Sequence, residues 1–287
     1  MDQLAQYMVT GVTLGSVYAL VGIGFTLISS VTGIINFAQG EFVMLGGMLA
    51  FWLMRVAGLP LPAAFVLAVV ATTAVGLVLE RAAIRPARSS PTISLIIITI
   101  GASILLRGLA GQFWGKEAVP LPPFSGDTPI KLGAAALLPQ SIWVVATMAA
   151  ITLVLKAVLD HTLLGKALRA CAMNRRASGF LGIDVGAMSL LTFAMSAAIG
   201  AIAGVVMAPI TMSSYDSGTM LGLKGFAAAA VAGFGSQFGT VLGGLFLGIA
   251  ESLGAAYISS AYKDAIALAV LFGVLLIRGS RSAGENE

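Results

Sequence analysis

The N-terminal part of the chain constrains the fold most strongly, because no charged side chain lies between Asp2 and Glu41. About 20 consecutive apolar residues cross the hydrocarbon core of a bilayer as a helix. Within this run, residues 33–42 read GIINFAQGEF, so that glycines and polar side chains stand where a membrane helix should continue. Non-helical backbone at membrane depth persists only where it is buried in protein or lines a water-filled route. The stretch indicates either a broken helix beside a substrate route or a short turn between two hydrophobic helices, and the spacing favours neither.

The composition of the whole chain indicates a polytopic membrane protein. Of 287 residues, 58% are hydrophobic and only 10% are charged, whereas a soluble domain carries roughly 25% charged residues. The charges are clustered between long uncharged runs. The net charge of +4 therefore reflects membrane topology and implies no nucleic-acid partner.

The uncharged runs predict an all-α integral membrane protein with eight or nine transmembrane segments, folded as a single transmembrane domain over residues 1–287. Two segments are short and interrupted by glycine, so we expect half-helices or re-entrant pieces at 42–57 and 223–236. The expected segments are 8–30, 42–57, 61–79, 92–113, 140–159, 189–210, 223–236, 237–256 and 262–278.

Basic residues set the expected orientation. They are concentrated around Arg85, in the loop at 160–188, and after the last segment. The expected segments place all three clusters on one side, which the positive-inside rule makes cytoplasmic. We therefore expect the N-terminus outside the cell, the C-terminus inside, and the proline-rich residues 114–139 in an extracytoplasmic loop. The simpler interpretation of this loop is a connector that only links two spans.

A second glycine-rich break occurs at residues 233–248, which read GFGSQFGTVLGGLFLG. Aligning residues 42–49 with 239–246 superposes the tripeptide LGG in both. Glycine-interrupted hydrophobic segments in opposite halves of a chain mark transport sites between structural repeats. The pattern predicts an internal repeat in which 233–248 is the counterpart of 33–42.

The residue inventory excludes most enzyme classes. The only histidine, His161, lies in an expected loop, so neither an intramembrane Ser–His dyad nor an HExxH zinc helix can form. Cys171 is the only cysteine, which excludes an internal disulfide and a cysteine metal site. No G-x-x-x-x-G-K-[ST] nucleotide-binding loop occurs. The chain is expected to be no enzyme and to hold no cofactor or metal of its own.

Four ionisable residues lie in or near the expected segments, where each costs roughly 2.5–3.5 kcal/mol at a helix centre. They are expected to face protein or water. For Arg107 and Glu251, a structural ion pair and a substrate contact are equally consistent with the sequence. Glu41 and Lys224 flank the glycine breaks and are assigned to function.

The loop at 160–188 carries an apolar pattern of its own. Leu164, Leu168 and Cys171 recur at three- and four-residue spacing, with Lys166 and Arg169 elsewhere on the helical wheel. This spacing is typical of a short amphipathic helix lying across a membrane surface. A basic loop held near anionic lipid is the simpler interpretation that spacing alone favours.

Three blocks of sequence, in this order, resemble the branched-chain (hydrophobic) amino-acid ABC importer permeases. Residues 11–47, GVTLGSVYALVGIGFTLISSVTGIINFAQGEFVMLGG, are similar to the start of these proteins. Residues 165–185, GKALRACAMNRRASGFLGIDV, resemble their cytoplasmic loop, and 222–253 match a third block. The resemblance runs nearly end to end and is poorest in the external loop.

This resemblance implies a membrane subunit of an importer in the bacterial inner membrane, which moves its ligand by alternating access. The expected partners are a second related permease or a second copy of this chain, two cytoplasmic ATPase subunits that bind ATP and Mg, and a periplasmic substrate-binding protein. The expected ligands are branched-chain or other hydrophobic amino acids. Many family members have His where this chain has Gln39, so urea, amides and aromatic or aliphatic acids remain alternatives. An ion-coupled secondary transporter is a weaker alternative, because only two deep acids are present.

The resemblance also assigns roles to individual residues. ATP-driven closure of the partner ATPases is expected to push on residues 164–183, and rigid helices are expected to carry that motion to the two breaks. The ATPase-coupling residues are Gly165, Arg169, Ala170, Asn174, Ala177 and Gly182. The translocation-path residues are Asn36, Phe37, Gln39, Gly40, Glu41, Lys224, Gly233 and Gly235.

Overall fold

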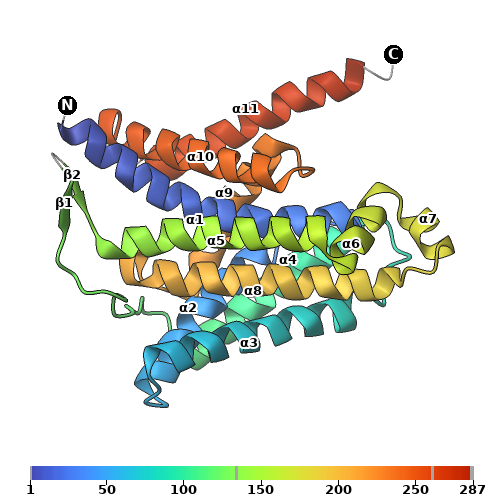
Figure 1. Ribbon diagram of the computed structural model, residues 1–287, viewed down its shortest axis with the longest axis horizontal. Coiled ribbons are helices and arrows are strands. Elements are labelled where there is room, and N and C mark those ends of the chain that lie inside the picture. Colours follow the sequence, from blue (N-terminus) through green and yellow to red (C-terminus); the bar gives the residue numbers. More distant parts are fainter. Residues whose placement is uncertain (1, 133–134, 260–261, 285–287) are drawn as a thin grey trace.

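The computed structural model describes residues 2–132, 135–259 and 262–284 (Figure 1). Within these ranges the regular secondary structure is helical apart from one short antiparallel hairpin, which confirms the all-α polytopic prediction. The elements are α1 (Asp2–Thr32), α2 (Gln39–Arg55), α3 (Leu61–Leu79), η1 (Glu80–Ile84), α4 (Thr92–Trp114), β1 (Ile130–Leu132), β2 (Ala135–Leu137), α5 (Pro139–His161), α6 (Leu163–Met173), α7 (Arg175–Phe180), α8 (Val185–Thr211), α9 (Ser217–Ala232), α10 (Gln237–Tyr257) and α11 (Lys263–Gly284).

Every expected hydrophobic segment corresponds to a helix. Among the described residues, six helices are long and apolar enough to cross a membrane: α1, α3 with η1, α4, α5, α8 and α10. The two segments expected to be short are short, since α2 has 17 residues and α9 has 16. However, α9 begins at Ser217 and not at the expected residue 223. The reason is that its first turn is polar and therefore carries no hydrophobic signal.

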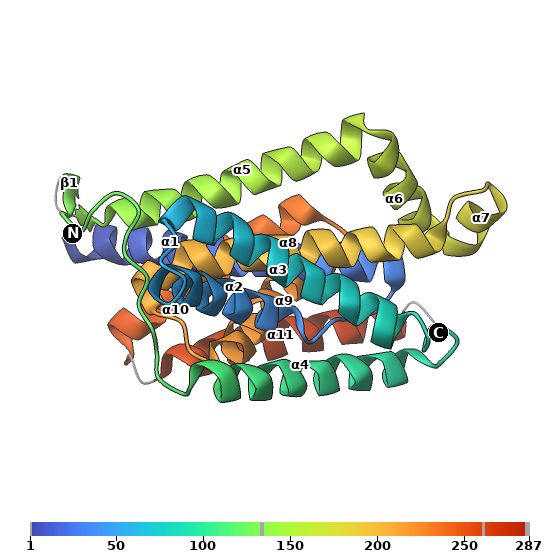
Figure 2. The same ribbon diagram turned by 90° about the horizontal axis from the view of Figure 1, so that it is seen from below.

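Helix α1 lies at the centre of the bundle. In its most apolar window 94% of the residues are buried, whereas the corresponding share for α4 is 17%. Figure 2 shows α4 along one edge of the molecule and α5 along the opposite edge. Because α4 buries only Leu95, Thr99 and Ala110 among its residues, much of its apolar surface stays open to lipid or to another chain.

The helices form two inverted halves. Helix α1 runs antiparallel to α8 through the centre of the molecule (Figure 1). After α1, residues 33–38 lead into α2, which packs on α8; after α8, residues 212–216 lead into α9, which packs on α1. In the same way α3 packs on α8 and α2, while α10 packs on α1 and α9. The repeat therefore relates α1–α4 to α8–α11.

The prediction that 233–248 is the counterpart of 33–42 was wrong. The alignment superposed α2 on α10, whereas the packing relates α2 to α9 and α3 to α10. The shared LGG tripeptide has a simpler cause, because small residues occur wherever two membrane helices approach closely. Gly46 packs on Ala201 of α8, and Gly243 packs on Ala228 of α9. The true counterpart of the first break is the link at 212–216.

The two ends of the bundle differ. One end carries α6 and α7, and the polypeptide also passes there from η1 into α4 (Figure 2). The other end carries the β1–β2 hairpin and the N-terminus of α1 (Figure 1). The long loop at that end is attached to the second break, since Val119 and Ser213 exchange backbone hydrogen bonds of 2.8 and 2.9 Å.

Candidate functional site

The first break turns the chain back into the bundle. Gly33 has a φ of +70°, which glycine adopts without strain. The Asn36 side-chain oxygen accepts the Ala38 N–H at 3.1 Å, and the Asn36 carbonyl accepts the Gln39 N–H at 3.1 Å. This turn starts α2 in the protein interior. The structure therefore supports a broken helix and not a turn at the end of two spans.

Gln39 fixes the depth at which α2 starts. Its amide nitrogen donates to the carbonyl of Ser196 in α8 at 3.2 Å. The Ser196 hydroxyl lies within hydrogen-bonding distance of both the Gln39 side-chain oxygen and the carbonyl of Gly24 in α1. Gly24 is about 12 Å of helix away from Thr32, the last residue of α1. Helix α2 thus begins well inside the membrane-spanning part of the bundle.

The N-termini of α2 and α9 meet at this depth. A Cβ atom added to Gly40 would lie 1.9 Å from the carbonyl oxygen of Gly218, and one added to Gly218 would lie 2.7 Å from the carbonyl oxygen of Gly40. Only glycine allows such an approach of two backbones. Both helices direct the positive ends of their dipoles towards this contact, which favours a negative charge beside it.

Glu41 supplies that negative charge. Its side chain is 1% exposed, and one carboxylate oxygen accepts the hydroxyl of Ser103 in α4 at 2.8 Å. The guanidinium of Arg107 lies nearby on α4 and donates to the hydroxyl of Thr219 in α9 at 2.8 Å. Glu41 is therefore held by both helix N-termini and by α4.

An aromatic cluster lies next to this polar site. The half-buried Phe37 in the break stacks on Phe226 of α9, with ring centroids 5.7 Å apart. Phe226 also contacts Phe25 of α1 at 5.7 Å and Phe234 after α9 at 5.3 Å. The break thus presents one aromatic surface, while Asn36 and Gln39 are fully buried behind it.

The segment matched to the coupling loop forms two capped helices, α6 and α7. The Thr162 hydroxyl accepts the Gly165 N–H at 3.0 Å and caps α6, and the Asn174 side chain accepts the Ala177 N–H at 3.0 Å and caps α7. Asn174 also closes α6, because its N–H donates to the Ala170 carbonyl at 3.0 Å. Gly182, with a φ of +83°, ends the segment before α8. Side-chain caps of this kind each stabilise a helix by about 1 kcal/mol.

Helix α6 is amphipathic, as the spacing predicted. Leu168 and Cys171 are buried against α1 and α5, and Gly165 packs so closely on α5 that an added Cβ would lie 2.2 Å from the Val158 carbonyl oxygen. Arg169 pairs with Asp160 on the outer side. Beyond this buried face, α6, α7 and the residue after α7 expose large apolar side chains, namely Leu163, Leu164, Met173, Phe180 and Leu181.

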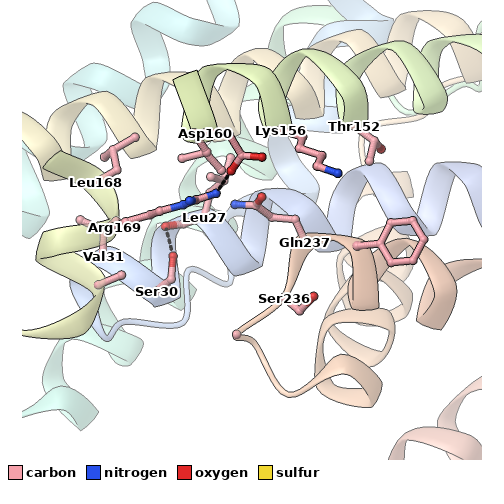
Figure 3. Close-up of a pocket in the computed structure, with 14 residues that line it drawn as sticks. Leu27, Ser30, Val31, Thr152, Lys156, Asp160, Leu168, Arg169, Ser236 and Gln237 are labelled. Carbon is pink, nitrogen blue, oxygen red and sulfur yellow. Dashed lines mark hydrogen bonds and ion pairs between the residues drawn. The ribbon is translucent and has the colours of Figure 1, made fainter. Parts of the chain in front are cut away.

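A cavity of about 340 Å³ separates α6 from the start of α10 (Figure 3). Its walls come from α1, α5, α6 and the turn between α9 and α10. Arg169 and Asp160 lie on one side, and Ser236 and Gln237 lie on the other. The cavity therefore brings a coupling residue, Arg169, and a residue of the expected path, Gly235, to the same space.

A contact that the sequence did not predict joins α7 to the first break. The Arg175 guanidinium donates to the Thr32 carbonyl at 3.1 Å. Thr32 ends α1, and its hydroxyl accepts the Ile34 N–H at 3.2 Å. Burial lowers the pKa of Arg175 from its ordinary value, and nearby Arg88 adds to this effect. The cation stands at the C-terminus of α1, where the helix dipole favours it.

Residues 7–275 match the protein family described as branched-chain amino acid transport system, permease component. The chain belongs to this family.

Curated relatives match the permease over nearly its whole length. It is 37% identical to the high-affinity branched-chain amino acid transport system permease protein LivH of Escherichia coli K12 over 304 residues, covering 98% of this chain and 96% of LivH. It is 36% identical to the corresponding protein BraD of Pseudomonas aeruginosa PAO1, with the same coverage of both chains. Among solved structures, it is similar to PsaBC from Streptococcus pneumoniae in complex with Fab, with 15% identity, a TM-score of 0.49, and coverage of 94% and 90% of the two chains.

The expected path residues of the permease separate into three places. Asn36, Phe37, Gln39, Gly40 and Glu41 lie together where α2 starts. Lys224 lies in a separate ion cluster. The two glycines, Gly233 and Gly235, lie in the turn between α9 and α10, where Gly233 ends α9 with a φ of +83°.

Lys224 belongs to a buried ion cluster of the permease. Its ammonium lies 2.9 Å from a Glu251 carboxylate oxygen and 2.7 Å from an Asp264 oxygen. Tyr18 of α1 donates to Glu251 at 3.2 Å, and Lys263 lies 3.4 Å from it. The cluster joins α1, α9, α10 and α11. The sequence left an ion pair and a substrate contact open for Glu251, and the structure pairs it with Lys224, a residue that the sequence assigned to the path.

Sequence reasoning missed Ser103, Thr219 and Arg175 as members of the site. Ser103 and Thr219 are hydroxyl residues without a motif, and their role appears only when α4 and α9 flank Glu41. Arg107 was open between structure and function, and its contact with Thr219 brings it to the same site. A usable signal was the polar sequence SSYDSGT at residues 213–219, in the link and the first turn of α9, which is unusually polar for the start of a membrane segment.

Proposed function

We propose that this permease forms part of the membrane-spanning core of an ABC importer and carries branched-chain or other hydrophobic amino acids by alternating access. The observation that carries the proposal is the α6–α7 segment, because two capped helices expose five large apolar side chains at one end of the bundle. An apolar surface held on rigid helices fits a protein partner better than water. The named ligands of LivH and BraD support the ligand class.

The proposed partners follow from this architecture. Two ATPase subunits, which bind ATP and Mg, dock on the α6–α7 end, and a substrate-binding protein docks on the opposite end. That orientation places α6 and α7 in the cytoplasm of a bacterium, the N-terminus and residues 114–139 outside, and the C-terminus inside. It agrees with the position of η1, the arginines in and just after it, and α7 at one end of the bundle.

A second permease subunit covers the face formed by α4 and α9. Arg107 is seven residues before the end of α4, or about 10 Å along the helix, so its charge lies within the hydrocarbon depth. Thr219 is exposed beside it, and Ile104, one helical turn earlier on α4, is exposed and apolar. A charged group at this depth faces protein or water and not lipid. The translocation path therefore runs between this face and the second subunit.

The coupling residues transmit ATPase closure to the break. The α6–α7 segment is fixed to α5 through Gly165 and to the end of α1 through Arg175. Displacement of α7 therefore pulls on Thr32 and on the link that leads to Glu41. The glycines at 233 and 235 serve as the flexible turn through which α9 follows this motion.

Reconstitution tests the proposal. The permease is co-expressed with its candidate partner permease, ATPases and binding protein, and L-[³H]leucine uptake is measured in liposomes. We expect stable co-purification, and uptake that requires both the binding protein and ATP hydrolysis. Uptake by this chain alone, driven by an ion gradient, would refute the importer assignment. Native mass spectrometry of the binding protein identifies the ligand and separates amino acids from urea, amides and carboxylic acids.

A further inference from the structure

Opposite charges lie side by side in the site at mid-depth without forming a direct ion pair. Within the part of the chain that the structure describes, the ion pairs do not include Glu41 or Arg107. Each charge is bound by a hydroxyl instead. Ser103 donates to Glu41 at 2.8 Å, and Arg107 donates to Thr219 at 2.8 Å. Ser103 and Arg107 are one helical turn apart on α4, so the contact of α4 with Glu41 of α2 and its contact with Thr219 of α9 lie on the same side of α4.

The second carboxylate oxygen of Glu41 is unsatisfied. It is buried and has no hydrogen-bond partner among the described residues. It points at the start of α9, since a Cβ added to Gly218 would lie 2.6 Å from it. A buried carboxylate with a free oxygen is costly unless a cation or donor completes it during function. The helix dipoles of α2 and α9 offset part of the cost but supply no donor to this oxygen.

We propose that Glu41 and Arg107 receive the two charged ends of a zwitterionic α-amino acid as it crosses the membrane, an inference that rests on the proposed function. The ligand's ammonium group, with three donors, binds Glu41, and its carboxylate binds Arg107, whose guanidinium offers paired donors for a carboxylate. Ser103 and Thr219 hold the two charges between transport cycles. The ligand displaces these hydroxyls without leaving either charge unpaired.

The surroundings fit an aliphatic side chain on the same ligand. Thr219 and Phe226 lie two helical turns apart on one face of α9, and Leu223 lies between them. Phe226 stacks on Phe37, whose ring is half-buried at the start of the path. A ligand with its charged end at Glu41 and Arg107 therefore directs its side chain along an apolar and aromatic surface. Urea and simple amides carry no charges, so they can hydrogen-bond to the two residues but form no ion pair with either.

Access to the pair depends on α4, which is the most loosely packed of the helices around it. Only three of its residues are buried, and Figure 2 shows it at the edge of the molecule. A small outward movement of α4 withdraws Ser103 from Glu41 and opens the carboxylate to the path. This movement requires no rearrangement of Asn36 or Gln39, which stay fixed in the bundle.

Transport measurements on the complete importer in liposomes test the proposal. Glu41→Gln and Arg107→Gln are compared with Arg55→Gln, which alters an exposed charge at the far end of α2. We expect L-leucine uptake per ATP hydrolysed to fall about tenfold in both site variants, with ATPase stimulation by the loaded binding protein retained. Arg107→Lys keeps the charge and should restore part of the uptake. Uptake near the wild-type level in both site variants, or equal loss of uptake and ATPase activity, would overturn the proposal.

A labelling experiment remains decisive if Glu41→Gln fails to assemble. The native Cys171 is buried, so a Thr219→Cys variant offers a thiol reagent one exposed target. We expect L-leucine to slow labelling about threefold or more at concentrations where leucinamide, a cation, and 4-methylpentanoate, an anion, do not. Equal protection by all three compounds, or none by leucine, contradicts zwitterion binding. Absence of ATP-dependent uptake by the wild-type complex would instead refute the importer assignment itself.

Discussion

Arg175 joins two parts of the molecule that are 143 positions apart in the sequence. Its guanidinium binds the last carbonyl of α1, and Arg175 itself begins α7. A charge-assisted hydrogen bond at a helix C-terminus is stronger than a neutral one. Under the proposed coupling, this contact links movement of α7 to the first break, so its removal should affect coupling more than folding.

We expect Arg175→Gln to lower L-leucine uptake per ATP hydrolysed severalfold, because a hydrogen bond to a charged group contributes about 1.5–3 kcal/mol. The ATPase activity itself should persist. Arg176→Gln is the matched control, since Arg176 is adjacent, exposed and equally charged. The measurement is the ratio of uptake to ATP hydrolysis in liposomes. An equal ratio in Arg175→Gln and in the control would show that the contact has no role in coupling.

The half-helices α2 and α9 depend on backbone contact at their N-termini. Gly40 and Gly218 allow this contact, and Glu41 is held beside it by α4. Neither half-helix spans the membrane alone, so each relies on the link before it and on the long helix that it packs against. The contact thus sets the position of the whole polar site, and a small increase in side-chain volume there should separate the two elements.

We expect Gly218→Ala to destabilise the permease by about 1–3 kcal/mol, the usual cost of overpacking a close contact, and to abolish most uptake. Gly101→Ala on α4 serves as the control, because an added Cβ at Gly101 meets no atom within 4 Å. That control should be neutral or slightly stabilising, since alanine favours helix. Thermal unfolding in detergent compares the two variants. Equal melting temperatures for Gly218→Ala and wild type would contradict the tight contact.

At the scale of the whole molecule, the inverted halves and the two unlike ends define how the permease sits in a membrane. The sequence was sufficient for the nine hydrophobic segments, the all-α class and the first break, because these rest on local hydrophobicity and polarity. It was insufficient for the second break at 212–216. Polar residues there look like an ordinary loop, and only packing of Gly218 on Gly40 shows their depth. The partner of Lys224 was equally hidden, because Glu251 lies on another helix.

Cysteine accessibility in intact cells and inverted vesicles tests the proposed orientation. We expect Asp127→Cys to react with a membrane-impermeant reagent only from outside, and Phe180→Cys only from the cytoplasmic side once the ATPases are removed. Both positions are exposed in the isolated chain, and the buried native cysteine contributes no background. Labelling of Asp127→Cys from the cytoplasmic side would reverse the topology and place α6 and α7 outside.

The backbone bridge between Val119 and Ser213 connects the long loop to the second break, at the end of the bundle opposite α6 and α7. Ser213 lies in the link that leads to α9 and Glu41, and Thr32 ends the helix that precedes the link to α2. Under the proposed orientation, a partner can act on Ser213 from the periplasm and on Thr32 from the cytoplasm. Because the two halves are inverted repeats, we expect displacement of either residue to move α2 and α9 against each other at the same point. Under the proposed function, the contact between Gly40 and Gly218 is therefore the one place where the loaded binding protein and ATPase closure act on each other.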